Sequence, residues 1–230
     1  AAEGKKLRAI RLDSGDLAYL SKAARAMLDE AGLGDVKIVA SNELDEHLIA
    51  ELKAQGARID SWGIGTRLIT AADQPSLGCV YKLVARERDG KWEPVIKISG
   101  NPEKVSTPGA KDVCRIVDPR TGKAMADYVA FVGETDAREG KPLELFDPVH
   151  PYMRQTVERY EAIPLLTRIF ERGTQLYELP DLAAIREFHR RQLALFWPET
   201  LRKLNPAPYP VDLSPAVWNR KMELIREHRL

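Results

Sequence analysis

The sequence predicts an α/β fold in which parallel strands alternate with helices that cross over between them. Along residues 7–80, a short apolar run is followed by polar residues and then by a helical pattern, and this unit recurs. Such a cadence is typical of parallel sheets. After residue 78 the pattern changes to paired β-rich runs separated by turn residues. The repeat fits either an incomplete (β/α) barrel or an open, doubly wound sheet.

The first unit consists of an apolar run at residues 7–12 and a helix that begins near residue 17. Asp16 is placed to cap this helix or to lie in its first turn, and Gly32 is a plausible stop. Apolar residues recur at helical spacing between these two positions: Leu17, Leu20, Ala24, Met27, Leu28 and Ala31.

Two further units follow the same pattern. VKIVA (36–40) predicts a strand, Ser41-Asn42 a helix start, and Gly56 a helix end. Acidic residues occupy the first turn, where the helix dipole favours negative charge: Glu43, Asp45 and Glu46. ARIDSW (57–62) predicts the third strand, which runs into GIGT (63–66).

The rest of the chain predicts two more parts. Residues 78–150 form a β-rich segment, with turns at Asp89-Gly90 and at residues 120–122. Residues 151–230 form a helical tail, clearest at 182–195, with a proline-rich extended strap at 204–215. The expected domains are therefore 1–77, 78–150 and 151–230.

Composition excludes several classes of protein. The 35 basic and 34 acidic residues give a net charge of +1, so no basic field attracts nucleic acid. Cys79 and Cys114 are too few for a disulfide framework, and we expect buried free thiols in a reducing cytoplasm. No apolar stretch reaches the ~18 residues of a membrane span.

Polar residues follow each of the three predicted parallel strands, in RLDSGD (11–16), ASNE (40–43) and WGIGT (62–66). Ligands of α/β sheets and barrels bind at the carboxyl ends of the strands. Arg11 offers a planar fork for a carboxylate or phosphate. Asp13 and Asp16 suit ribose hydroxyls or a hydrated Mg²⁺. Alternatively, Arg11 and Asp13 form an ion pair and Asp16 is only a cap.

The second and third strand ends suit a phosphate. Gly63 and Gly65 leave room for backbone N–H groups, with Thr66 at the start of the next helix. Ser41 and Asn42 offer a hydroxyl and an amide at an equivalent position. Alternatively, residues 63–66 form an ordinary turn and Ser41-Asn42 is an ordinary helix cap.

Other signals are weaker. The four histidines lack metal-ligand spacing, and we interpret all of them as structural or surface residues; no metal site is predicted. The loop at 100–111, with two lysines and two hydroxyls, is either a lid over an anion or, as we favour, a surface loop.

Four long strings resemble bacterial nicotinate phosphoribosyltransferases: IRLDSGDLAYLSKAAR, VKIVASNELDE, IDSWGIGTRLITAADQPSLGCVYKLV and IKISGNPEKVSTPG. The resemblance is close from residue 8 to about 125 and looser to the end, where NPAPYPVDLSP is also similar. It implies part of an irregular (β/α) barrel of the type II phosphoribosyltransferase kind, joined to a β-rich segment. It further implies a homodimer, Mg²⁺, and ATP as co-substrate.

The implied reaction joins nicotinate to phosphoribosyl pyrophosphate, giving nicotinate mononucleotide and pyrophosphate in NAD salvage. Arg11 would then face the nicotinate carboxylate and Asp13 the ribose or pyrophosphate, with Ser14 also in the substrate site. Ser41 and Asn42 would lie beside the ribose phosphate. The 5′-phosphate would bind at the glycine turn: Gly63, Gly65 and Thr66.

The family's phosphohistidine lies before the RLDSGD strand, so the resemblance assigns it to no histidine of this chain. We therefore expect the chain to be a C-terminal portion, paired with a missing N-terminal half and inactive by itself. Two other hypotheses remain open: a nicotinamide phosphoribosyltransferase, which the GIGT string disfavours, and a non-catalytic phosphate-binding or regulatory fragment.

Overall fold

The computed structural model describes residues 6–101 and 104–228 and divides the chain into two compact units, Ala1–Val80 and Tyr81–Leu230. Each unit has its own sheets and is described by itself. Among the described residues, no helix has both the length and the apolar content that a membrane crossing requires.

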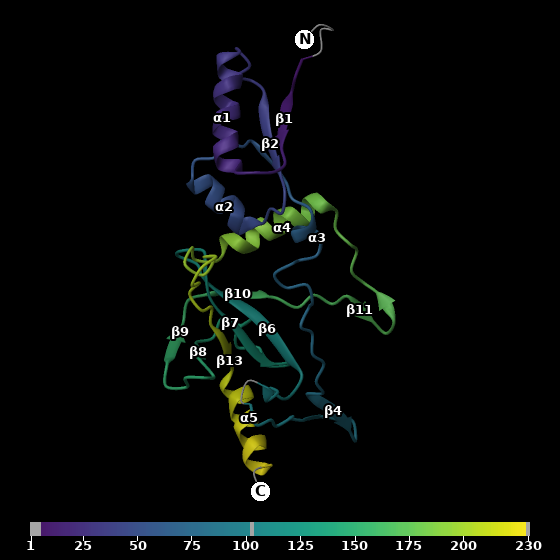
Figure 1. Cartoon of the computed structure of the whole chain (residues 1–230). Coiled ribbons are helices and arrows are strands. Elements are labelled where there is room, and N and C mark those ends of the chain that lie inside the picture. Colours follow the sequence, from purple (N-terminus) through teal and green to yellow (C-terminus); the bar gives the residue numbers. More distant parts are fainter. Residues whose placement is uncertain (1–5, 102–103, 229–230) are drawn as a thin grey trace. The chain divides into compact units, whose positions relative to one another are not determined.

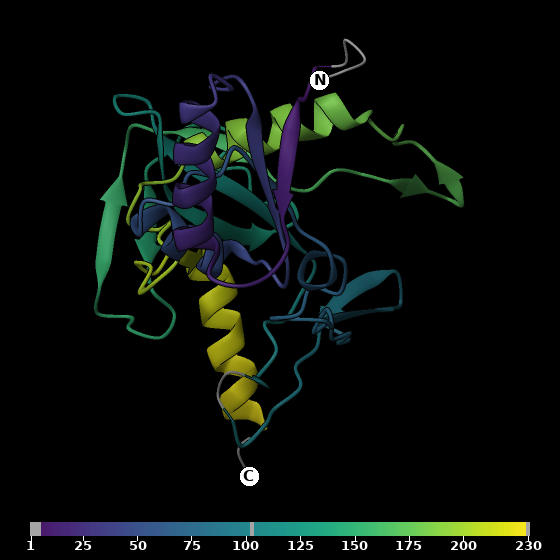
Figure 2. The ribbon, with the colours of Figure 1, turned by 45° about the horizontal axis from the view of Figure 1, so that its top comes forward.

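The first unit is a three-stranded parallel sheet in the order β1-β2-β3, with helices between the strands. Its elements are β1 (Ala9–Leu12), α1 (Leu17–Glu30), β2 (Lys37–Ser41), α2 (Glu46–Ala54), β3 (Ser61–Gly63) and α3 (Thr66–Ile69). Helix α1 runs alongside β1 and β2 (Figures 1 and 2). A small core fills the space between them: Leu17, Ala18, Ala40, Leu44 and Leu52.

Local sequence explains where these helices begin. The Asp16 carboxylate accepts the N–H of Tyr19 and caps α1, as predicted. The cap of α2 was predicted wrongly. Asp45, and neither Ser41 nor Asn42, accepts the N–H of Leu48 there.

The third strand is shorter than the expected 57–62, since only Ser61–Gly63 pairs with β2. Before it, the Asp60 side chain accepts the backbone N–H of Ile38, which belongs to β2. A side chain therefore takes the place of a ladder bond at this edge. After the glycines, α3 holds only four residues.

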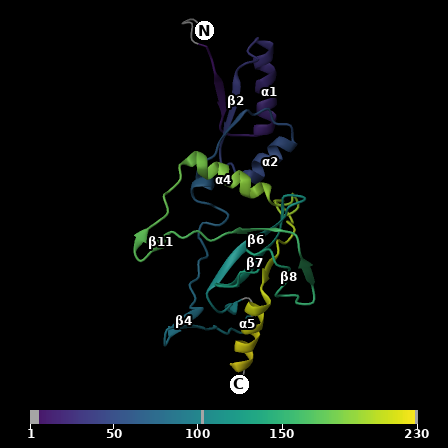
Figure 3. The same ribbon diagram turned by 180° about the vertical axis from the view of Figure 1, so that it is seen from behind.

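The second unit is built around a four-stranded sheet in the order β10-β6-β7-β13, of which Figure 3 labels β6 and β7. Strands β6 (Lys111–Asp118) and β7 (Lys123–Phe131) form the predicted hairpin about residues 120–122. Asp89-Gly90 joins β4 (Ala85–Arg88) to β5 (Lys91–Pro94), also as predicted. Strands β8 (Leu143–Phe146) and β9 (Arg154–Val157) form a third hairpin, and β11 (Phe170–Glu171) and β12 (Thr174–Gln175) a fourth.

Residues 151–230 are less helical than expected. Helices α4 (Leu182–Ala194) and α5 (Pro215–Glu227) are present, but this part also supplies β9 to β13. Strand β10 (Glu161–Pro164) pairs with β6, and β13 (Val211–Leu213), inside the predicted strap, pairs in parallel with β7. Residues on both sides of position 150 thus share one sheet and one core. Cys114 lies in that core, whereas Cys79 is exposed, contrary to our expectation.

A charged side chain ties the strap and α4 to this sheet. The Arg115 guanidinium donates to both oxygens of Asp127, at 2.9 and 3.1 Å, and to the side-chain oxygen of Gln192 at 3.0 Å. The Tyr209 hydroxyl donates to Asp127 at 2.9 Å. The Arg115 guanidinium carbon lies 4.6 Å from the centroid of the Phe196 ring. Arg115 and Asp127 are both mostly buried. Their network therefore holds β6, β7, α4 and the strap in one arrangement.

The loop at 100–111 is neither a free lid nor a simple surface loop over its described second half. Ser106, Pro108 and Gly109 are buried, and the Ser106 hydroxyl accepts the N–H of Lys97 at 2.8 Å. The Lys111 ammonium donates to the carbonyls of Thr107, Pro108 and Gly109. This part of the loop is therefore fixed to the second unit by its own polar groups.

We predict that Gly109→Ala strongly destabilises the second unit. Gly109 has φ +85°, and an added Cβ would lie 2.2 Å from a ring carbon of Phe131. Backbone strain and overpacking together are expected to lower the free energy of unfolding by about 2–4 kcal/mol in urea denaturation. Gly122→Ala is the matched control, because its φ is +65° but nothing lies within 4 Å. Equal losses for both variants would contradict the steric explanation.

Candidate functional site at the carboxyl ends of the parallel strands

The parallel register of β1, β2 and β3 brings the three predicted strand ends to one edge of the sheet. Leu12 pairs with Ala40, and Ser41 pairs with Gly63, so the residues that follow each strand are neighbours. A Cβ added to Gly63 would lie 3.4 Å from Cβ of Ser41. The glycine thus allows the third strand end to approach the second closely.

Arg11, Asp13 and Ser41 form a hydrogen-bonded cluster at this edge. The Arg11 guanidinium donates to one Asp13 oxygen at 2.6 Å, and the Ser41 hydroxyl donates to the other at 2.9 Å. The side chains of Arg11 and Asp13 are 64% and 56% exposed, so the cluster faces solvent. Within the described residues the guanidinium makes no other hydrogen bond, which leaves N–H groups for an anion.

The cluster keeps Asp13 ionised. The hydrogen bond from Ser41 and then the hydrogen bond and charge of Arg11 lower the pKa of Asp13. As pH falls through this lowered pKa, the carboxylate is protonated and loses both interactions. At neutral pH the Asp13 carboxylate is a fixed anion that can accept hydrogen bonds from hydroxyl groups. The neighbouring Arg11 has unused N–H donors that can bind an anionic substrate.

Ser14 and Asn42 lie at the same edge with open side chains. Both residues are exposed, and their side chains make no hydrogen bond within the described part of the chain. Gly15, directly after Ser14, has φ +77° and turns the chain from β1 into α1. Asn42 has φ 146°, and its carbonyl accepts the N–H of Leu44 at 2.6 Å. The turn conformations therefore present both side chains to solvent.

The glycine turn at 63–66 is also open. Nothing lies within 4 Å of a Cβ added to Gly65, and Thr66 begins α3 as an exposed residue. No hydrogen bond engages the Thr66 hydroxyl within the described residues; only its carbonyl is used, by Thr70. Packing thus does not account for the glycine at 65, which is compatible with a ligand approaching the backbone.

Asp45 and Arg67 complete the site but were not predicted as a pair. Asp45 caps α2 and lies 3.6 Å from the Arg67 guanidinium, which follows the glycine turn. The backbone N–H of Leu48 is the main cause that lowers the pKa of Asp45. This pair joins the start of α2 to α3 across the second and third strand ends. The sequence did carry a signal for the Asp45 cap, because an aspartate stands directly before the helical pattern of α2. The pairing of Asp45 with Arg67 could be seen only in the folded structure.

We predict that Ser41→Ala raises the pKa of Asp13. The Ser41 hydroxyl is the largest cause of the lowered value, so its removal moves the pKa toward that of an ordinary aspartate. NMR titration of the Asp13 carboxyl carbon measures the change. Ser61→Ala, at the start of β3, is the control and should leave Asp13 unchanged. An unchanged Asp13 pKa in Ser41→Ala would show that the serine does not hold the carboxylate.

Metal-binding residues do not gather in the described ranges 6–101 and 104–228, where no group of three or more histidine, cysteine or acidic residues could hold a metal ion. Of Asp13, Asp16 and Asp45 at this edge, Asp16 caps α1 and Asp45 caps α2, which leaves Asp13 for ligand chemistry. A single carboxylate fits a Mg²⁺ ion that is bound mainly by substrate phosphates and water. Protein sites for this ion commonly supply only one or two carboxylates.

Comparison with known proteins gives consistent matches. The profile of the nicotinate phosphoribosyltransferase C-terminal domain matches residues 110–221. The chain is 53% identical to nicotinate phosphoribosyltransferase of Bacillus subtilis (strain 168) over 95% of its own length and 44% of that protein. It is 34% identical to the mouse (Mus musculus) nicotinate phosphoribosyltransferase, over 92% of this chain and 39% of that protein.

Solved structures agree with the sequence relatives. The crystal structure of human nicotinic acid phosphoribosyltransferase superposes with a TM-score of 0.67 at 27% identity, covering 96% of this chain and 40% of that chain. Nicotinate-nucleotide pyrophosphorylase from Pyrococcus furiosus superposes with a TM-score of 0.56 at 28% identity, covering 84% and 41%. The chain thus spans less than half the length of these relatives.

Proposed function

We propose that this chain, which belongs to the nicotinate phosphoribosyltransferase family, supplies part of the site that joins nicotinate to phosphoribosyl pyrophosphate. The observation that carries the proposal is the Arg11–Asp13–Ser41 cluster beside an open glycine turn at the ends of three parallel strands. The products would be nicotinate mononucleotide and pyrophosphate, in the salvage route to NAD. The chain spans 44% of the length of its Bacillus subtilis relative, and in this proposal residues outside this sequence complete the site.

The cluster separates two tasks. The free N–H groups of Arg11 bind the nicotinate carboxylate, because a guanidinium pairs with a carboxylate through parallel hydrogen bonds. Asp13, held ionised, accepts hydrogen bonds from ribose hydroxyls. Ser41 acts through Asp13 by fixing its orientation, and the exposed Ser14 and Asn42 side chains contact the substrate from the adjoining turns.

The glycine turn binds the 5′-phosphate. Gly63 and Gly65 allow the backbone N–H groups to approach the phosphate, and the free hydroxyl of Thr66 donates to it. The carboxylate of nicotinate and the 5′-phosphate of phosphoribosyl pyrophosphate are then both anchored. This orients the ribose carbon that carries the pyrophosphate for attack by the nicotinate nitrogen. The transition state has oxocarbenium character, so positioning and stabilisation of the leaving pyrophosphate provide the catalysis.

The rest of the proposed enzyme lies outside the Arg11–Asp13–Ser41 cluster. The three parallel strands form part of an irregular (β/α) barrel that a segment preceding the chain completes, and that segment carries the phosphohistidine through which ATP hydrolysis is coupled. Bound with the phosphates, Mg²⁺ would neutralise charge on the pyrophosphate, with Asp13 as the carboxylate at hand. The intact protein works as a homodimer.

The intact protein tests the proposal. Purified with whatever segment precedes Ala1, it should release pyrophosphate from phosphoribosyl pyrophosphate only when nicotinate and Mg²⁺ are present, and faster with ATP. Nicotinamide replaces nicotinate in the control, because it lacks the carboxylate. Absence of nicotinate-dependent release would contradict the proposed function, and equal use of nicotinamide would contradict the carboxylate assignment.

We predict that Thr66→Val in the intact protein raises the KM for phosphoribosyl pyrophosphate about tenfold to 100-fold, because one hydrogen bond to a charged group is lost. The KM for nicotinate should change little. Thr70→Val is the matched control, since Thr70 is the C-cap of α3 and its hydroxyl donates to the Thr66 carbonyl, at the other end of the helix from the glycine turn. Steady-state kinetics with each substrate varied in turn decide the matter. An unchanged KM for the donor would remove Thr66 from the phosphate site.

A further inference from the structure

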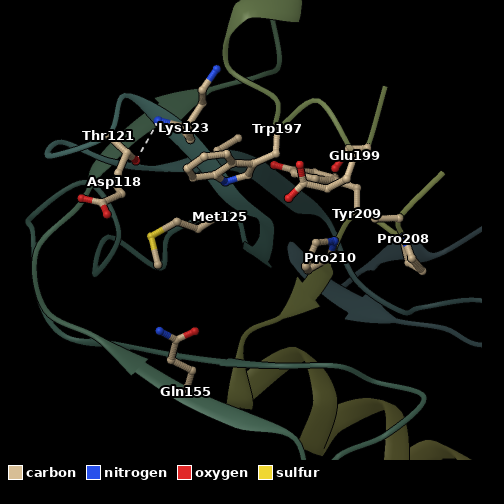
Figure 4. Close-up of a pocket in the computed structure, with 13 residues that line it drawn as sticks. Asp118, Thr121, Lys123, Met125, Gln155, Trp197, Glu199, Pro208, Tyr209 and Pro210 are labelled. Atoms are coloured by element: carbon tan, nitrogen blue, oxygen red, sulfur yellow. Dashed lines mark hydrogen bonds between the residues drawn. The ribbon is translucent and has the colours of Figure 1, made fainter. Parts of the chain in front are cut away.

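A cavity of about 360 Å³ lies within the second unit and is lined only by residues between 118 and 210 (Figure 4). Its walls come from the β6–β7 turn, from β7, from β9, from the segment after α4 and from the strap. The volume is within the range of small-molecule sites, about 300–1,000 Å³. The strand-end site uses none of these residues.

Part of the cavity lining is apolar. It includes the Trp197 indole, the Met125 thioether and the Pro210 ring (Figure 4). Trp197 is 44% exposed, so part of its indole is accessible to a ligand. The Lys123 ammonium lies over one face of this ring, 5.8 Å from the ring centroid, which leaves the other face as a stacking surface for a second planar ring.

Most polar groups of the lining are already paired. The Lys123 ammonium donates to the carbonyls of Ala194 and Phe196, at 2.8 and 3.2 Å. Both oxygens of Asp118 bind Arg120, and the Tyr209 hydroxyl donates to Asp127. These groups form the frame of the cavity and offer little to a ligand.

Three polar side chains of the lining have no hydrogen-bond partner within the described residues: the Gln155 amide, the Glu199 carboxylate and the Thr200 hydroxyl. Gln155 reaches toward the cavity from β9, on the side opposite Trp197 (Figure 4). Its amide offers one acceptor and two donors, the combination that pairs with the edge of adenine, which has a ring-nitrogen acceptor beside an amino group. The Glu199 carboxylate can only accept, which also suits an amino group.

We propose that this cavity binds a purine base of the adenine type, stacked on Trp197 and hydrogen-bonded by Gln155, with Glu199 accepting from the amino group. A cationic ligand is disfavoured, because the Lys123 ammonium lies 5.8 Å from the centroid of the Trp197 ring. The neighbouring Glu199 carboxylate disfavours an attached phosphate, so the nucleoside is the matching form.

The walls are held in place before any ligand arrives. The backbone N–H of Ala207 donates to the Glu199 carbonyl at 2.9 Å, and Tyr209 is fixed through Asp127 to Arg115. The backbone of the walls therefore need not rearrange on binding, and the groups to be ordered are the exposed Gln155 and Glu199 side chains.

Isothermal titration of the full chain with adenosine tests this site, with ribose as the ligand that lacks the base. Adenosine should bind with 1:1 saturation and ribose should give no heat of binding. Trp197→Ala should weaken adenosine about tenfold or more, since base stacking is lost. Gln155→Leu should weaken it at least about fivefold. Trp92→Phe, on β5 and outside this cavity, should leave the affinity unchanged.

Three results would overturn the site: no saturable adenosine binding up to millimolar concentration, equal weakening by Trp92→Phe, or unchanged affinity in Gln155→Leu. Because Gln155 is exposed on a short strand, its substitution should leave the fold intact, and a thermal melt of each variant checks this. The test is independent of pyrophosphate release, so it can fail without affecting the proposed function.

Discussion

Arg11→Ala in the intact protein should lower kcat/KM for nicotinate about tenfold to 100-fold, mainly through KM. On the proposed assignment, the substitution removes the planar donors for the nicotinate carboxylate, and charge-assisted hydrogen bonds of this kind contribute about 1.5–3 kcal/mol. It also removes the cation that pairs with Asp13 at 2.6 Å, so the pKa of Asp13 should rise. Steady-state kinetics and the Asp13 titration measure the two effects.

Two variants sharpen this prediction. Arg8→Ala, immediately before β1, is the matched control and should change neither KM. Arg11→Lys keeps the charge but loses the fork, and should recover only part of the nicotinate affinity. If Arg11→Ala weakened nicotinate and phosphoribosyl pyrophosphate equally, Arg11 would not be the carboxylate ligand.

Arg115→Leu should lower the free energy of unfolding of the second unit by about 3–5 kcal/mol. The substitution leaves Asp127 buried without its cation, and removal of one partner of a buried pair is costly for this reason. Asp127 and Tyr209 hold the strap, and Gln192 belongs to α4, so both segments should loosen. Urea denaturation gives the loss of stability, and hydrogen exchange of α4 shows where it occurs.

An exposed pair provides the control for Arg115. Arg168 and Glu171 are 2.7 Å apart, with the arginine side chain 68% exposed, and Arg168→Leu should change stability by less than about 1 kcal/mol. A double variant, Arg115→Leu with Asp127→Leu, should regain part of the loss because no buried charge remains unpaired. A loss below about 1 kcal/mol in Arg115→Leu would show that the network does not stabilise the sheet.

Most of the first unit could be predicted from the sequence because its signals are local. Apolar periodicity located α1 and β2, and the cap at Asp16 depends on side chains a few residues apart. Parallel strands then required the strand ends to meet, which predicted that Arg11, Asp13 and Ser41 are neighbours. The helix cap at Asp45 was missed because Ser41-Asn42 offers an equally good local signal, and only pairing with β3 shows that Ser41 ends the strand.

The second unit was harder to predict, because its defining contacts join residues far apart in the chain. Nothing local indicates that a proline-rich strap contributes a strand beside β7 or that Tyr209 reaches Asp127, which is separated from it by 82 positions. The cavity beside Trp197 has the same origin, since its lining comes from five separate segments. Its Gln155 and Glu199 are ordinary surface residues in the sequence pattern.

A structure of the intact protein with nicotinate mononucleotide bound would show whether the strand ends form the nucleotide site. We expect the nicotinate carboxylate to lie within hydrogen-bonding distance of the Arg11 guanidinium. We also expect the 5′-phosphate to lie on the backbone N–H groups of residues 63–66 and the Thr66 hydroxyl. A nucleotide bound away from the ends of β1, β2 and β3, or one with its carboxylate and phosphate exchanged, would rule out the proposed site.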